Sequence, residues 1–257
     1  MDFNYFLADP AGNVTVLVEN PVDPSRLTEV GSALLSLEKS AEQVGFLSPA
    51  PVMEGICLRM AGGEFCGNAT LSAGACRLSM DGISSGSVPV FVYGVRAPLT
   101  VSVREVSDSV YEGVADMPLP EEVSDISLSF EGKTYPLGFV SFGGIAHLIT
   151  EQTLDAASAE AAIRQWSREL SVPALGLISV DRTKSALTPL VYVPALDSLY
   201  WEKSCASGTC AAAVWFARGG SAYREFSEPG GTLGCETGPS LLRLHNTVCL
   251  EHKTLQI

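Results

Sequence analysis

Positive charge is scarce in this sequence. Its 257 residues contain 16 Lys and Arg against 29 Asp and Glu, which gives a formal net charge of −13 at pH 7. A chain with this charge is repelled by the phosphate backbone of nucleic acids and by the surface of an anionic membrane. We therefore expect neither a nucleic-acid partner nor a membrane partner.

Long apolar runs are missing as well. No stretch reaches the roughly 18 apolar residues of a membrane span, and the N-terminal residues lack the basic and apolar regions of a signal peptide. We expect a cytoplasmic protein. Hydrophobic residues make up 46% of the chain and charged residues 18%, so it can bury a sizeable core. We expect Trp166, Trp201 and Trp215 to belong to that core.

Cysteine is present, but not in the patterns of a disulfide scaffold or a zinc site. The seven Cys are an odd number, none forms a CxxC pair, and neither Cys205 nor Cys210 has a His close in sequence. The sequence also lacks a phosphate-binding glycine loop and a lysine in the context of a pyridoxal site. We therefore expect reduced thiols, no metal and no cofactor.

The chain passes twice through the same order of predicted elements. Each half has a hairpin, a long helix, two strands, a loop with a cysteine and a helix of small residues. The loops read CGNAT from Cys66 and CASGT from Cys205. This order predicts a duplicated α+β unit, with an N-terminal half at 1–118 and a C-terminal half at 119–257, whose chain end can pack back onto the first half. The alternative is a coincidence between two ordinary α/β segments.

Each of these cysteines lies between a predicted strand and a predicted helix, at about 69–79 and 210–218. The N-terminus of a helix carries free N–H groups and a partial positive charge, which lower the pKa of a thiol and bind a carboxylate. Two such thiols can take a proton from one face of a Cα and return one to the other face. The alternative for Cys66 and Cys205 is a purely structural role in packing.

The cysteine loops resemble those of the diaminopimelate epimerase-like superfamily of cofactor-independent amino-acid racemases. The chain looks most like the histidine racemase branch known from opine-type metallophore synthesis, and the resemblance covers most of its length. The motifs that carry it read PAGN, EQVGF, GEFCGNAT, PLVYVP and WEKSCASGT. The resemblance implies two pseudo-symmetric halves, each a mixed β-sheet curved around a central helix, with the active site in the cleft between them. It leaves a homodimer possible.

The resemblance also implies roles for individual residues. Cys66 and Cys205 match the acid/base pair, and Glu202 matches the acidic residue that holds the α-ammonium group. His147 matches a pocket histidine, with a buried core histidine as the alternative. The resemblance further implies that the α-carboxylate is bound by backbone N–H groups of Gly67, Asn68, Ala206 and Ser207. It implies that Asn13 and Gln43 line the pocket.

Three departures bear on the substrate. Diaminopimelate epimerases use two arginines and an asparagine for the distal carboxylate, where this chain has Leu71, Lys203 and Ile145. A site without those partners disfavours a second buried carboxylate. We therefore expect an amino-acid racemase with histidine as its substrate. The alternatives are a racemase or epimerase of diaminopimelate or another amino acid, and a protein that binds an amino acid without turning it over.

Overall fold

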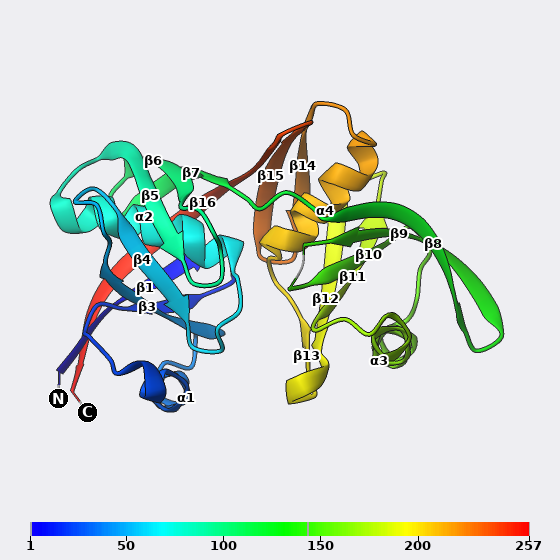
Figure 1. Cartoon of the computed structure of the whole chain (residues 1–257), viewed down its shortest axis with the longest axis horizontal. Coiled ribbons are helices and arrows are strands. Elements are labelled where there is room, and N and C mark those ends of the chain that lie inside the picture. The colour runs from blue at the N-terminus through cyan, green and yellow to red at the C-terminus, as the bar shows by residue number, and fades with distance from the viewer. Residues whose placement is uncertain (1, 143, 257) are drawn as a thin grey trace. The chain divides into compact units, whose positions relative to one another are not determined.

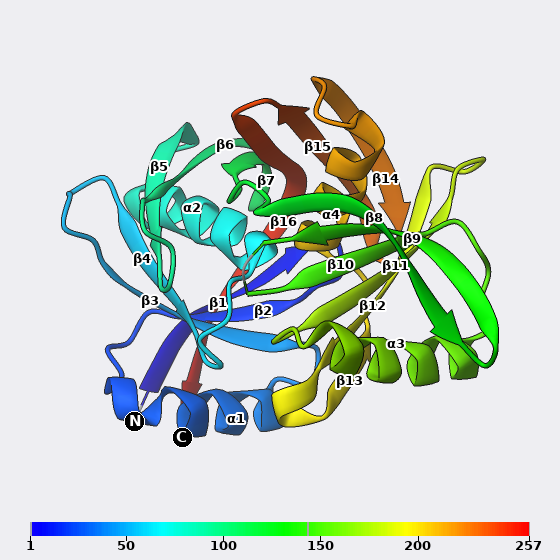
Figure 2. The ribbon, with the colours of Figure 1, turned by 45° about the vertical axis from the view of Figure 1, so that its right-hand side comes forward.

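A computed structural model describes residues 2–142 and 144–256 of the chain. Gly143, in the glycine pair that precedes His147, therefore lies outside the described residues. The chain divides into two compact units: unit 1 is Met1–Met117 with Leu244–Ile257, and unit 2 is Pro118–Arg243. Each unit combines a β-sheet with helices, so the predicted α+β class is confirmed (Figures 1 and 2).

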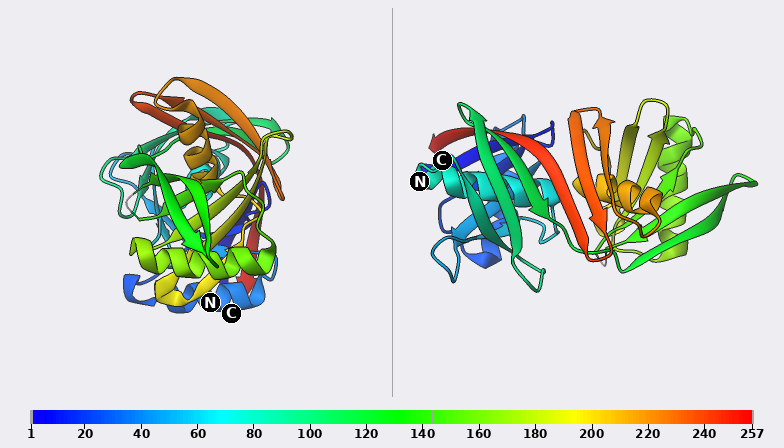
Figure 3. Two further views of the ribbon diagram at one scale, coloured as in Figure 1. Left: turned by 90° about the vertical axis from the view of Figure 1, so that its right-hand side faces the viewer. Right: turned by 90° about the horizontal axis from the view of Figure 1, so that it is seen from above.

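The sheet of unit 1 closes on itself. Its strands follow the order β1-β2-β3-β4-β5-β6-β7-β16, and β16 also pairs with β1. The two ends of the chain therefore lie side by side, with Asp2 opposite Gln256 (Figure 3). The strands are β1 (Asp2–Pro10), β2 (Thr15–Val18), β3 (Gln43–Pro49), β4 (Ile56–Met60), β5 (Ser85–Val92), β6 (Leu99–Ser107), β7 (Val110–Asp116) and β16 (Leu241–Gln256).

Helix α2 (Gly67–Asp81) is enclosed by this sheet and contacts β1, β2, β4, β5, β6 and β7. Its residues from Gly67 to Cys76 are buried on every side, which small side chains permit. A Cβ at Gly74 would lie 2.5 Å from a methyl carbon of Val101, so the helix and the sheet approach as closely as a glycine allows. Helix α1 (Leu27–Leu37), after a 3-10 turn at Pro24–Arg26, lies outside and packs one face on the sheet.

The sheet of unit 2 follows the order β8-β9-β10-β11-β12-β14-β15, with β13 paired to β12. The residues of β11 alternate between its two faces. Leu175 and Leu177 belong to the core cluster around Trp166 of α3 (Ala156–Leu170), whereas Ile178 points toward α4 (Ala206–Ala217). The strands are β8 (Glu122–Phe130), β9 (Lys133–Ser141), β10 (Ala146–Thr150), β11 (Leu175–Asp181), β12 (Ala186–Val193), β13 (Ser198–Trp201), β14 (Ala222–Glu228) and β15 (Gly231–Gly238).

The two units share one pattern of strand pairing. In unit 1, β2–β3 is parallel, β3–β4 antiparallel, β4–β5 parallel and β5–β6 antiparallel. In unit 2, β10–β11, β11–β12, β12–β14 and β14–β15 repeat that sequence of directions. Parallel neighbours need a crossover connection. The crossover from β4 to β5 contains the small-residue helix α2, and the crossover from β12 to β14 contains the small-residue helix α4. The two cysteine loops therefore occupy the same place in their units.

The three tryptophans differ in burial. Trp166 is fully buried, so its predicted place in the core is confirmed; its indole donates to the Ser129 carbonyl at 3.1 Å. Trp201 is 40% exposed, and the core prediction is wrong there, because its indole reaches the half-buried Glu160 near the surface. Trp215 is partly buried. None of the described helices is long and apolar enough to cross a membrane.

Candidate active site

Both loop cysteines are the N-cap residues of their helices. Cys66 and Cys205 have extended backbones, and each sulfur accepts a hydrogen bond from a first-turn N–H group: Ala69 at 3.4 Å and Gly208 at 3.3 Å. Helices α2 and α4 thus begin at residues 67 and 206. The predicted starts at 69 and 210 are wrong, because a sulfur acceptor replaces the usual oxygen cap and lets Gly, Asn and Ser enter the first turn.

In unit 1, a network of amides surrounds Cys66. Gln43, the first residue of β3, donates from Nε2 to the Cys66 sulfur at 3.3 Å and to Asn13 Oδ1 at 2.6 Å. Asn68, in the first turn of α2, also donates to Asn13 Oδ1, at 3.4 Å. Asn13 follows β1, so four segments distant in sequence bring their side chains together. The predicted residues Asn13, Gln43, Cys66 and Asn68 therefore form one group.

Two further residues join this network: Glu42, which stands beside Gln43 in the EQVGF motif, and Asn246, which no local pattern in the sequence marks. Asn246 of β16 donates to Asn68 Oδ1 at 3.2 Å, across 178 positions of the chain. Glu42 accepts from Asn13 Nδ2 at 3.0 Å. Asn13 and Asn68 are buried, and buried amides are costly to leave without partners. Asn246 and Glu42 therefore help to fix the orientation of the two asparagines beside Cys66.

In unit 2, Ser207 connects His147 to Cys205. The hydroxyl of Ser207 lies 2.9 Å from His147 Nε2 and 3.7 Å from the Cys205 sulfur. His147 comes from β10 and is fully buried. The predicted residues His147, Cys205, Ala206 and Ser207 thus form a second group at the start of α4.

A buried carboxylate, Glu228, holds the backbone of this second loop. It accepts a hydrogen bond from the Cys205 N–H at 2.6 Å and another from the Thr209 hydroxyl. Burial raises the pKa of Glu228 to about 7, helped by the charge of Glu202, while its two hydrogen bonds act in the opposite direction. The residue ends β14, directly before the Pro229-Gly230-Gly231 turn.

The protonation of Cys205 differs from the prediction. Burial raises the pKa of the Cys205 thiol far above its usual range, and the carboxylates of Glu202 and Glu228 raise it further. Hydrogen bonds from Gly208 and Ser207 offset only part of this. The expected lowering is therefore wrong for Cys205, because burial, together with the nearby carboxyl groups of Glu202 and Glu228, outweighs the hydrogen bonds to its sulfur.

His147 is neutral at physiological pH. Burial lowers its pKa to about 3. Within the described ranges its Nδ1 atom has no hydrogen-bond partner, and it faces the backbone of Gly176 on the adjacent strand β11. A Cβ at Gly176 would lie 2.2 Å from Nδ1. The absence of a side chain at position 176 is therefore what lets the imidazole reach Ser207.

We expect Gly176→Ala to destabilise the protein by about 1–3 kcal/mol, the usual range for overpacking a core. The added methyl group must push the imidazole away from β11 and break its contact with Ser207. Urea denaturation measures the loss. Gly144→Ala is the matched control, because a Cβ there meets no atom within 4 Å. Equal stability of the two variants would contradict the packing that we describe around His147.

In the first turns of α2 and α4, the backbone N–H groups have no carbonyl of the same helix to which they can donate a hydrogen bond. In both helices the first intrahelical bond of the i to i−4 type runs to the cysteine carbonyl, from Thr70 at 2.9 Å and from Thr209 at 2.9 Å. Ala69 and Gly208 donate to the cysteine sulfurs, and the N–H groups of the residues before them lie at the helix end, where helices bind carboxylates. Among the described residues, no three His, Cys, Asp or Glu side chains are grouped so as to hold a metal ion.

Comparison with known proteins finds relatives that match most of the chain. Residues 2–246 match the family model of the histidine racemase CntK N-terminal domain. The chain is 30% identical over 222 residues to a histidine racemase of Fusobacterium nucleatum, covering 81% of this chain and 79% of that protein. It is 26% identical over 238 residues to a histidine racemase of Staphylococcus aureus, covering 88% and 85%. A predicted epimerase from Pseudomonas aeruginosa shares the fold, with a TM-score of 0.72, 14% identity and 99% of each chain covered.

Proposed function

The chain belongs to the family of the histidine racemase CntK N-terminal domain, and we propose that it interconverts L- and D-histidine without a cofactor. The observation that carries the proposal is the pair of helix N-cap cysteines, one in each unit. Each has a sulfur held by a backbone N–H group and lies among residues that the family resemblance assigns to substrate binding.

The proposed mechanism uses Cys66 and Cys205 as a proton-transfer pair. A thiolate removes the α-proton and becomes a thiol, while the other thiol delivers a proton to the opposite face of Cα and becomes a thiolate. One Cα–H bond breaks on one face and one forms on the other, so the configuration at Cα is inverted and the proton on sulfur has moved from one cysteine to the other. The positive ends of α2 and α4 stabilise the negative charge that builds up on the α-carboxylate as the proton leaves.

Residues beside the cysteines would hold the substrate. The backbone N–H groups of the first turns bind the α-carboxylate, and Glu202 holds the α-ammonium group. Asn13 and Gln43 line the pocket near Cys66, and His147 positions Ser207 near Cys205. The carboxylate ligands in this proposal are Gly67, Asn68, Ala206 and Ser207.

We assign the thiol and the thiolate from the contacts of each sulfur. Cys205 is buried near two carboxylates that raise its pKa, which supports a protonated thiol in the resting protein. The Cys66 sulfur accepts from Gln43 Nε2 as well as from Ala69 N–H, and donors to a sulfur favour the thiolate. In the resting protein Cys66 would thus be the base and Cys205 the acid.

The decisive experiment follows the α-hydrogen of histidine in deuterated water. We expect the protein to replace it with deuterium and to produce the opposite enantiomer from either L- or D-histidine. Nuclear magnetic resonance measures the exchange and chiral chromatography measures the inversion. A protein that only binds histidine would show neither, and that outcome would reject the enzyme proposal. The homodimer and the cytoplasmic location expected from the sequence stay predictions.

We expect kcat/KM for L-histidine to exceed that for LL-diaminopimelate by at least tenfold, which is about 1.4 kcal/mol of transition-state binding. Leu71 stands where diaminopimelate epimerases have an arginine; its side chain is uncharged and fully buried against Gly113, so this position has no cation for a distal carboxylate. Initial rates with both substrates, and with glutamate and lysine, test this. A tenfold preference for diaminopimelate would overturn the substrate assignment and leave the two-thiol mechanism standing.

A further inference from the structure

Unit 2 contains a cavity at the opposite end of α4 from Cys205. It has a volume of about 260 Å³ and is lined mainly by three arginines and three aromatic residues: Arg182, Arg218, Arg224, Trp215, Phe216 and Phe226. We call it the arginine pocket. Phe216 lies ten residues after the start of α4, roughly 15 Å along the helix axis. The arginine pocket is therefore separate from the cysteine, serine and histidine group of this unit.

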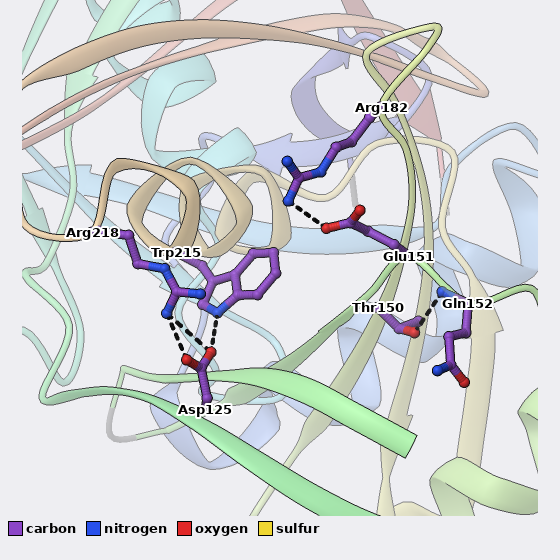
Figure 4. Close-up of polar contacts among 7 residues, drawn as sticks. All are labelled: Asp125, Thr150, Glu151, Gln152, Arg182, Trp215 and Arg218. Carbon is purple, nitrogen blue, oxygen red and sulfur yellow. Dashed lines mark hydrogen bonds and ion pairs between the residues drawn. The ribbon is translucent and has the colours of Figure 1, made fainter. Parts of the chain in front are cut away.

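The arginines are unusual in so acidic a chain, where 16 basic residues face 29 acidic ones. Two of them have carboxylate partners outside the cavity lining. Arg182 donates to Glu151 at 2.5 Å, and Arg218 makes two contacts with Asp125 at 2.8 and 3.0 Å. Figure 4 shows both guanidinium groups, on either side of the Trp215 indole in that view. Ion pairs of this exposed kind, and the charge at the end of α4, are enough to explain Arg218.

Arg224 has no such explanation. In the part of the chain that the structure describes, it has no carboxylate partner, and its guanidinium group lies 5.5 Å from the centre of the Phe216 ring. The Arg182 guanidinium lies 4.7 Å from the same ring centre. Two cationic groups thus gather at one aromatic ring, and only one of them is paired with a carboxylate. An anion at the edge of Phe216 would meet both groups, with donors suited to bidentate binding.

The apolar part of the lining is aromatic, with the Trp215 ring tilted by 59° to the Phe216 ring. Phe216 and Phe226 are stacked with ring centres 6.3 Å apart and planes at 29°, and the Trp215 ring centre is 4.9 Å from that of Phe216. Aromatic faces and edges of this kind favour a planar apolar ligand. The volume is somewhat below that of pockets for drug-sized ligands, which begin at roughly 300 Å³.

We propose that the arginine pocket binds a small aromatic carboxylate. The carboxylate contacts Arg224 and Arg182, and the attached ring lies against Trp215, Phe216 and Phe226. This binding site is independent of the histidine racemase activity, because it uses none of the residues assigned to proton transfer or substrate binding.

The three tryptophan indoles allow a direct test with the full chain. The indole N–H of Trp215 donates to Asp125 at 2.8 Å, beside the pocket, whereas that of Trp201 donates to Glu160 at 2.8 Å and that of Trp166 to a carbonyl. Benzoate should move the Trp215 indole signal in a ¹H–¹⁵N spectrum saturably and leave the other two in place. Trp215→Phe identifies that signal. Trp201 is the internal control, because a general salt effect would act on both carboxylate-bound indoles.

Ligand chemistry and one substitution complete the test. We expect R224Q to weaken benzoate binding at least tenfold, and R164Q to leave it unchanged. Arg164 is the matched control, since it also lies over an aromatic ring, Tyr192, and pairs with Asp197 outside the pocket. Equal shifts with benzamide, tighter binding of inorganic phosphate, equal movement of Trp201, or undiminished binding by R224Q would each overturn the proposal. The benzoate and benzamide titrations of the natural protein decide it even if R224Q does not fold.

Discussion

Replacing either Cys66 or Cys205 with alanine is expected to lower kcat for histidine racemisation by a factor of about 10³ or more. Each thiol handles a different proton in the proposed mechanism, and positioned acid–base groups contribute about 10²–10⁴ to a rate. Because inversion needs both transfers, the loss should be large for each single variant. Chiral chromatography of reactions started from L-histidine and from D-histidine measures the effect.

The matched control for these variants is Cys249→Ala. Cys249 is an exposed free cysteine on β16, so its removal should leave kcat unchanged. Circular dichroism then shows that the site variants remain folded. Turnover near that of the natural protein in either Cys66→Ala or Cys205→Ala would reject the two-thiol mechanism.

The same variants distinguish the two sulfurs. If Cys66 is the resting thiolate, the ultraviolet absorbance of a thiolate near neutral pH should be lost in Cys66→Ala and kept in Cys205→Ala. The buried Cys205, with Glu202 and Glu228 nearby, should contribute little to it. The reverse result would exchange the acid and the base and leave the rest of the mechanism in place.

The location of the cysteine loops could be predicted because the signals are local. A cysteine after a strand, followed by small and polar residues, places a helix start within a few positions, and the resemblance to histidine racemases that rests on these motifs is confirmed. The protonation of Cys205 could not be predicted. It depends on the burial of the sulfur and on Glu228, which lies 23 positions away and reaches the loop only after β14 has paired.

In unit 1 too, contacts between residues far apart in the sequence could not be predicted. Asn13, Gln43 and Asn68 belong to recognisable motifs, but Asn246 reaches Asn68 because β16 returns to the first strand at the end of the chain. The sequence allows for the return of the chain end to the first half, but no local pattern marks Asn246 as the residue that contacts Asn68. The shared pairing directions of the two units support our proposal of an internal duplication near residue 118, with Leu244–Ile257 joined to the N-terminal unit.

Glu228 provides the second large effect, a change of stability with pH. Its pKa of about 7 in the folded protein lies above the usual value of 4.5, so the folded state keeps a proton that the unfolded state has lost. Between these two pH values the unfolded state binds fewer protons, and stability must fall as pH rises. A shift of this size lowers the free energy of unfolding by roughly 3 kcal/mol, and most of that loss has occurred by about pH 7.

Glu228→Gln removes this titration and keeps an oxygen for the Cys205 N–H. Between pH 4.5 and 7 the natural protein should therefore lose roughly 3 kcal/mol of unfolding free energy relative to Glu228→Gln. Urea denaturation of both proteins across that range measures it. Thr209→Val should extend the window to higher pH, because the Thr209 hydrogen bond lowers the pKa of Glu228. A difference that stays constant over the range would mean that Glu228 is already ionised in the folded protein at pH 4.5, and that a full negative charge lies beside Cys205 throughout.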